Sequence, residues 1–228
     1  MCGKFTAMAS WAQVVAFSQP LTADRYDKSD DREVTLRVMN YIPVIALDKK
    51  TGLRRVMPIR WGFPHPKDLR RPQPIHARAE GIDTTRAFAE AFHDGQRGIV
   101  LMKTFNEAPD VEGPTVQHTI TPGDEPALAA AVVWRRFELE GLPAPLLAFC
   151  LVTVPANELI RKLPTDRMPA FLAAGDWGKW LGEEPAPIEE VKACLKTVEG
   201  VNWHMEKEQR AVRPRKQKPT VSDPGGLI

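Results

Sequence analysis

The chain has 228 residues, 43% hydrophobic and 26% charged, and its 31 basic and 29 acidic residues give a net charge of +2. These proportions are ordinary for a soluble globular protein, and the length fits one large domain or two small ones. The sequence begins without the features of a signal peptide and has no apolar run of transmembrane length, so we expect a cytoplasmic protein outside the membrane.

In chain order, the first half is predicted to contain a strand at 3–9, a helix at 11–17 after a cap at Ser10, a surface loop at 19–34, strands at 34–39, 42–47 and 54–61, a proline-rich irregular segment at 62–74, and a helix at 84–93. The second half is predicted to contain buried strands at 96–105, 127–134 and 146–154 and helices at 156–163, 173–181 and 189–195.

Short strands outnumber helices in this pattern, which predicts an α+β fold or a mixed β-barrel with peripheral helices. We expect one domain over residues 1–205. Residues 206–228 alternate charges with prolines and are predicted to be a basic, poorly ordered tail.

Three cysteines, Cys2, Cys150 and Cys194, form no CxxC or Cys/His cluster. Such a sparse, odd set favours neither a disulfide framework nor a metal site and fits a reducing compartment. We therefore expect no metal and no cofactor.

Five segments, taken together, resemble the SOS response-associated peptidase family, also called abasic-site processing proteins. They are MCGKF at 1–5, RWGF at 60–63, IHARAE at 75–80, ANE at 156–158 and DRMP at 166–169. The resemblance implies a compact α+β domain around a curved, barrel-like mixed or antiparallel sheet. It also implies covalent capture of abasic sites in single-stranded DNA, with autopeptidase activity, by a monomer.

The resemblance implies that Cys2 is the nucleophile and Glu107 the general acid or base. Where the family has a catalytic histidine this chain has Thr165, and where it has an asparagine this chain has His76. Lys4 replaces the usual arginine. These departures indicate a divergent member, and a phage-related one is an option we leave open.

The chemistry of Cys2 fits this implication. Once Met1 is removed, one residue carries an α-amine and a thiol, with ordinary pKa values of about 8 and about 8.5. The amine can form an imine with the aldehyde of an opened abasic sugar, and the thiol can then close a thiazolidine ring. The alternative is that Cys2 is an ordinary buried residue.

The basic residues between positions 54 and 78 are interleaved with Trp61 and Phe63, a combination typical of single-stranded DNA binding. The candidate DNA-contacting residues are Lys4, Trp61, Phe63, Arg70, Arg71 and Arg78. The alternative is a solvated basic loop whose aromatic residues lie in the core.

Three hypotheses follow. The first is a DNA-repair enzyme that captures abasic sites. The second is a catalytically weakened single-strand DNA-binding protein, which Thr165 and His76 favour. The third is an N-terminal-nucleophile amidohydrolase, which would have stacked sheets between layers of helices.

Overall fold

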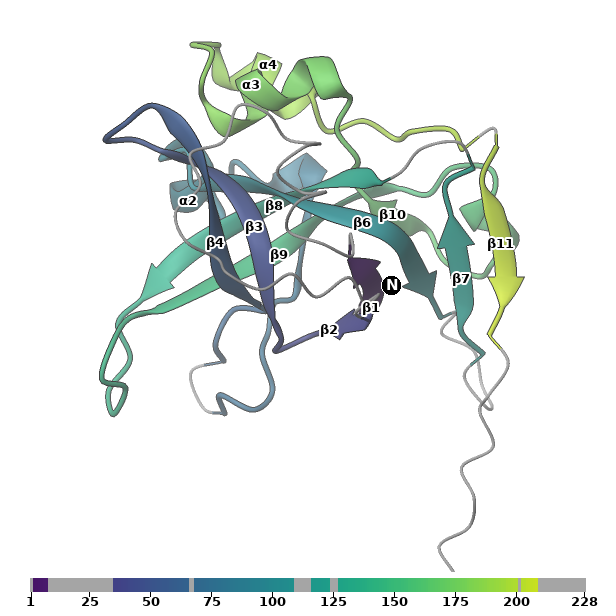
Figure 1. Ribbon diagram of the computed structural model, residues 1–228, viewed down its shortest axis with the longest axis horizontal. Helices are drawn as coiled ribbons and strands as arrows, with labels where there is room; N and C mark the ends of the chain where they lie inside the picture. The colour runs from purple at the N-terminus through teal and green to yellow at the C-terminus, as the bar shows by residue number, and fades with distance from the viewer. Residues whose placement is uncertain are drawn as a thin grey trace, which may run out of the picture.

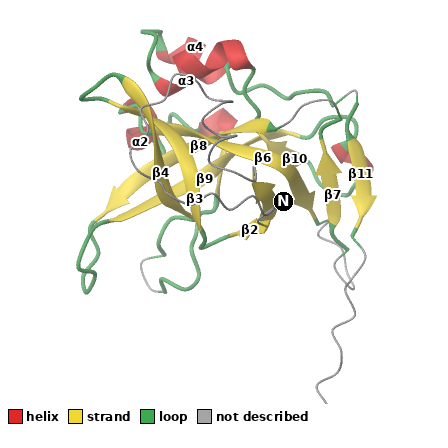
Figure 2. Ribbon diagram, viewed as in Figure 1, coloured by secondary structure: helices red, strands yellow, loops and turns green. Residues whose placement is uncertain are grey.

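The fold is built around one large β-sheet (Figure 1). The computed structural model describes residues 2–7, 35–65, 68–108, 116–123, 127–200 and 202–208. Within these ranges eleven strands join into a single sheet. Helices are short and lie at its periphery (Figure 2).

Five of the strands close into a barrel, because each is paired with two of the others. Around the ring they are β3 (Tyr41–Asp48), β4 (Leu53–Trp61), β9 (Leu146–Pro155), β8 (Leu128–Phe137) and β6 (Arg97–Glu107). The β4–β9 pair is parallel and the other four pairs are antiparallel. The predicted curved, mixed sheet is thereby confirmed.

Two of these strands are long enough to continue beyond the barrel. The second half of β6 pairs with β1 (Lys4–Ala7) and β7 (His118–Thr121). The end of β9 pairs with β5 (His76–Arg78) and β10 (Arg167–Pro169). Outer strands β2 (Thr35–Arg37) and β11 (His204–Lys207) pair with β1 and β7. The candidate site lies at these extensions of β6 and β9 and at the short strands that pair with them.

The barrel interior is filled by close-packed apolar side chains. The rings of Trp61 and Phe149 stack with centroids 6.2 Å apart, and Phe5 packs 5.4 Å from Trp61. A side chain at Gly98 would bring its Cβ within 2.5 Å of Val44, so only glycine lets β6 approach β3 this closely.

The helical elements are η1 (Ala79–Gly81), α2 (Ala89–His93), η2 (Ile160–Lys162), η3 (Ala174–Asp176), α3 (Trp177–Leu181) and α4 (Ile188–Ala193). Helices α3 and α4 lie together at the top of the view in Figure 1. In the part of the chain that the structure describes, no helix has the length and hydropathy needed to cross a bilayer.

The predicted strands are confirmed in the described residues, but two helices were predicted too long. The one expected at 84–93 is helical only from Ala89 to His93. The one expected at 156–163 is a single 3-10 turn, whose Ile160 amide donates to the side chain of Asn157. The predicted tail also begins too early, because Glu206 and Lys207 belong to β11. The predictions for 11–17, 19–34 and 209–228 concern residues outside the described ranges.

Candidate active site

The four residues singled out for catalysis come from distant parts of the sequence and meet at one place. Cys2 precedes β1, Glu107 ends β6, His76 begins β5, and Thr165 lies two residues before β10. The Glu107 carboxylate raises the pKa of the Cys2 thiol, the side chain of Thr165 lowers the pKa of Glu107, and Nε2 of His76 lies 2.7 Å from the Cys2 carbonyl oxygen. The two strand extensions therefore bring both halves of the site together.

Cys2 is held at its backbone and at its side chain. Its carbonyl oxygen lies 2.7 Å from Nε2 of His76, and its thiol donates to the carbonyl of Lys4 at 3.4 Å. Only 2% of Cys2 is exposed. Burial, reinforced by the nearby Glu107 carboxylate, raises the pKa of the Cys2 thiol to about 12. The thiol is therefore neutral at physiological pH, and its reaction requires a base to remove the proton.

Glu107 is the acidic residue whose charge acts on the Cys2 thiol. It is fully buried, and burial raises the pKa of its carboxyl group above the usual value. Hydrogen bonds, including one from the side chain of Thr165, act in the opposite direction. A carboxyl group with a raised pKa exchanges protons near neutral pH more readily than an ordinary glutamate, which suits general acid–base catalysis.

His76 has the environment of a neutral imidazole. Burial lowers its pKa to about 4, so the ring is uncharged at neutral pH. Because the carbonyl oxygen of Cys2 can only accept, the ring must donate from Nε2, leaving Nδ1 without a proton. The ring also packs edge-on against Trp61, with centroids 6.3 Å apart. His76 thus anchors the backbone of Cys2.

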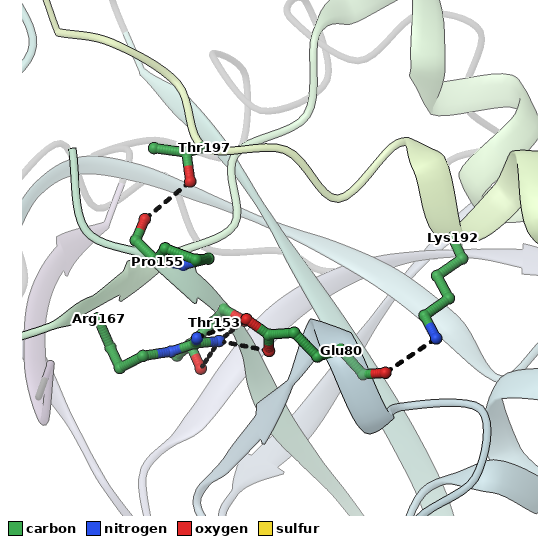
Figure 3. A network of polar contacts seen from close by, with 6 residues as sticks. All are labelled: Glu80, Thr153, Pro155, Arg167, Lys192 and Thr197. Atoms are coloured by element: carbon green, nitrogen blue, oxygen red, sulfur yellow. Dashed lines mark hydrogen bonds and ion pairs between the residues drawn. The ribbon is translucent and has the colours of Figure 1, made fainter.

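An ion pair fixes the segment that carries Thr165. The guanidinium of Arg167 binds both carboxylate oxygens of Glu80, at 2.6 and 2.9 Å, and donates to the carbonyl of Thr153 (Figure 3). The backbone carbonyl of Glu80 accepts from Lys192 of α4. These contacts join β10, β9 and η1 beside the candidate site, so they set where Thr165 and His76 lie relative to each other.

Two residues predicted to stack on DNA bases are core residues. Trp61 is 0% exposed and Phe63 is 3% exposed. Trp61 faces Phe5 and Phe149, and Phe63 packs against Phe88 and Phe137. The prediction was wrong because the end of β4 and the residues that follow it are buried, Arg60 included, so interleaving with basic residues did not mark exposed aromatic rings.

The predicted basic cluster is divided by the fold. Arg54 forms an ion pair with Glu183, and Arg55 forms one with Asp48. The charges of these two arginines are therefore compensated within the protein. Lys67 lies outside the described residues.

The remaining basic residues predicted to contact DNA differ in their exposure and in their ion pairs. Lys4 pairs with Glu208 at 2.5 Å. Arg70 and Arg71 have side chains 90% and 87% exposed, and each forms an ion pair with Asp68. Arg78 is exposed and lies two residues after His76 on β5, therefore on the same face of the strand. Of the predicted contacts, Arg78 is the one placed beside the candidate site.

Lys4 also lines a pocket of about 460 Å³ on the outer side of β1 and β6, with Gly3, Arg37, Asn106, Ala108, Gln117 and Glu208. Asn106 and Ala108 flank Glu107 along β6, so their side chains face away from it. This pocket is therefore separated from the candidate site by the sheet.

Metal-binding geometry is not seen in the part of the chain described. No group of three or more His, Cys, Asp or Glu side chains there is arranged to hold a metal ion. The three cysteines are buried free thiols.

The model of one protein family, the SOS response associated peptidase (SRAP) family, matches residues 1–214. The chain belongs to the SRAP family. This places it among SOS response-associated, peptidase-like proteins and accounts for the order of the five sequence segments. Among curated proteins, none matches the sequence significantly.

Solved structures support the same fold. A protein from Bacteroides thetaiotaomicron is 20% identical with a TM-score of 0.76, the alignment covering 92% of this chain and 93% of that one. A protein from Bordetella bronchiseptica is 18% identical with a TM-score of 0.73, covering 91% and 100%. A phage-related protein from the same organism is 16% identical with a TM-score of 0.67, covering 92% and 95%. The single barrel-centred sheet also differs from the stacked sheets that the amidohydrolase hypothesis required.

Sequence reasoning missed how Arg167 and Glu80 are used. Both lie in segments that carry the family resemblance, at 166–169 and 75–80, but neither was singled out. Their opposite charges in two separate motifs were the available signal. Their pairing depends on β5 and β10 flanking the same end of β9, which only the topology reveals.

Proposed function

We propose that this SRAP protein captures abasic sites in single-stranded DNA as a thiazolidine on Cys2, after removal of Met1. The observation that carries the proposal is the proximity of Cys2 to the buried carboxyl group of Glu107. Both groups required by the chemistry of an N-terminal cysteine, a nucleophile and a proton-transfer residue, lie in one site.

The reaction proceeds in two bond-forming steps. The α-amine of Cys2 attacks the aldehyde carbon of the opened sugar, and the carbinolamine loses water to give an imine. The thiol sulfur then adds to the imine carbon while its proton passes to the nitrogen, closing the five-membered ring. Glu107 protonates the departing hydroxyl and accepts the proton of the thiol.

Other residues orient the reactants. Donation from His76 to the Cys2 carbonyl fixes the backbone next to the amine. Arg78, exposed on the same face of β5, contacts a phosphate of the damaged strand. Exposed Arg70 and Arg71 add further charge. Autopeptidase activity, in this proposal, is removal of Met1 at the same site, with Glu107 as the proton-transfer group. The protein acts as a cytoplasmic monomer.

A second function is favoured by one observation. Thr165 cannot transfer protons as an imidazole does, and His76 is occupied by the Cys2 carbonyl. A chain lacking both imidazole functions would bind single-stranded DNA while reacting slowly or not at all.

The two functions are separated by a denaturing gel. Protein whose Met1 removal is confirmed by mass spectrometry is mixed with single-stranded DNA carrying one abasic site, beside Cys2→Ala and, as a matched control, Cys150→Ala. A heat-resistant band from the wild type and Cys150→Ala, absent from Cys2→Ala, supports capture. Binding on a native gel without such a band supports the second function, and neither binding nor a band contradicts both.

A further inference from the structure

Three arginines are buried in the described part of the protein, and they differ in how their charges are compensated. Arg60, Arg97 and Arg167 are 8%, 6% and 7% exposed. Arg97 donates to the carbonyls of Trp180 and Phe92. Arg167 binds Glu80 and Thr153.

Arg60 has no comparable partners. Within the described ranges its Nε is buried without an acceptor, and its side chain makes one hydrogen bond, a contact of 3.5 Å from Nη2 to the carbonyl of Gly62. No carboxylate among the described residues pairs with it. A buried guanidinium has five N–H donors, and leaving most of them unused is costly. Such a residue is suited to an anion that arrives from outside.

An exposed aromatic ring lies next to this arginine. Tyr41 and Arg60 are directly opposite in the β3–β4 register, so their side chains share one face of the sheet. Tyr41 is 60% exposed, in contrast to the buried Trp61 and Phe63. A cation and a solvent-facing ring on one face are the two parts of a contact for a nucleotide: one binds the phosphate and the other stacks on the base.

The position of the pair relative to the candidate site is fixed by the backbone. The turn before Tyr41 is tied to the end of β4, because the Met39 amide donates to the Trp61 carbonyl and the Trp61 amide donates to the Asn40 carbonyl. Trp61 in turn contacts His76, which holds Cys2. Tyr41 and Arg60 therefore lie at the end of the barrel where β3 begins and β4 ends, with their side chains on the face of the sheet opposite to that of Trp61.

We propose that Arg60 and Tyr41 form a binding site for one nucleotide of single-stranded DNA, with Arg60 on the phosphate and Tyr41 stacked on the base. This site holds an undamaged nucleotide near the lesion and rests on the proposed function in its choice of DNA as ligand. It replaces Trp61 and Phe63 as the aromatic part of the interface.

Binding of an undamaged single-stranded oligonucleotide tests the site without covalent capture. Fluorescence anisotropy is measured over a series of salt concentrations for the wild type, Tyr41→Ala, Tyr41→Phe and Arg60→Gln. Tyr41→Ala is expected to weaken binding about tenfold, whereas Tyr41→Phe retains affinity. Arg60→Gln is expected to lower the slope of log affinity against log salt by about 0.7, the value for one phosphate on a single strand.

Matched controls lie on the same strand at its opposite end. Leu53→Ala removes an exposed apolar side chain there, and Arg55→Gln removes an arginine that pairs with Asp48. Both are expected to bind DNA like the wild type. Thermal unfolding separates a binding role from a structural one: Arg60→Gln should unfold at the wild-type temperature or above, because it removes a buried charge that has no carboxylate partner.

The site is overturned if Tyr41→Ala and Arg60→Gln bind the oligonucleotide with wild-type affinity and salt slope. It is also overturned if Arg60→Gln unfolds at a lower temperature while Tyr41→Ala binds normally, which assigns Arg60 a structural role. Stabilisation of the wild type by inorganic phosphate, lost in Arg60→Gln without any change in DNA affinity, would assign the site to a free anion instead. Failure of covalent capture with these binding effects intact would contradict only the proposed function.

Discussion

The imidazole Nε2 of His76 lies 2.7 Å from the carbonyl oxygen of Cys2, so a side chain on β5 holds the backbone of a residue that precedes β1. The two residues are 74 positions apart in the sequence. The contact orients the segment whose amine must approach an aldehyde, while burial of the ring disfavours its protonated form. The protonation of His76 is therefore linked to folding.

Stability should fall as the pH decreases below the ordinary pKa of histidine. Between pH 6.5 and about pH 4 the unfolded chain binds a proton at His76 whereas the folded chain does not. The contribution of the neutral His76 ring to the free energy of unfolding is fully present above this window. It decreases by up to about 3 kcal/mol as the pH falls through the window. Denaturant unfolding at pH 7 and pH 5 should show a smaller pH effect in His76→Asn. The control His93→Asn should keep the wild-type dependence, and an equal dependence in all three proteins would argue against a buried neutral His76.

Glu107→Gln should lower activity and raise stability together. The pKa of Glu107 is raised in the folded protein, so the stability it contributes is present below its ordinary value of 4.5 and is lost as the pH rises through the folded pKa. The neutral amide avoids this loss. The free energy of unfolding of the variant, relative to that of the wild type, should be higher at pH 7.5 than at pH 4.5.

The same variant should capture abasic sites about 100-fold more slowly, since a proton-transfer group is removed. Single-turnover kinetics on an abasic oligonucleotide provide the measurement. A wild-type rate in Glu107→Gln would exclude Glu107 as the acid or base.

Thr165→His restores an imidazole next to Glu107. If the family's histidine transfers protons during capture or reversal, the variant should accelerate one of these steps by at least about tenfold at pH 6.5. The neighbouring substitution Asp166→His, at an exposed position, serves as the control. Identical rates for Thr165→His and the wild type would mean that the threonine at position 165 does not limit the rate of capture or reversal.

Glu80→Ala should destabilise the protein and slow capture through the position of Thr165. It leaves the guanidinium of Arg167 buried without its carboxylate, but the Glu80 side chain is 54% exposed, so solvent screens part of the loss. We expect a cost of about 1–2 kcal/mol in denaturant unfolding. Glu138→Ala, which breaks the exposed pair with Arg136, should cause no measurable change. Equal effects of the two substitutions would show that the Arg167–Glu80 pair is an ordinary surface ion pair.

The sequence predicted the long strands well because β6, β8 and β9 each contain an uninterrupted apolar run, at residues 99–102, 128–134 and 146–152. Strands β5 and β10, with three residues each, carry too little pattern to be recognised and depend on pairing with β9. Helix 156–163 failed because Asn157 caps a single turn that does not continue.

The candidate site was predicted in part. Cys2, Glu107, His76 and Thr165 were found through the family resemblance, and the topology brings them together. Trp61 and Phe63 were misplaced because sequence alone does not show that the end of β4 and the residues after it are buried on both faces. Tyr41 was not recognised, because its exposure follows from its place at the start of β3.

Capture by Cys2 can be measured through the intact mass of the product formed with a short abasic oligonucleotide. We expect a species equal to the Met1-free protein plus the oligonucleotide minus one water, since imine formation releases water and ring closure releases nothing. Proteolysis should map the adduct to Cys2, and Cys2→Ala should form none. An adduct located elsewhere, or no adduct from Met1-free protein that binds the strand, would contradict capture by Cys2.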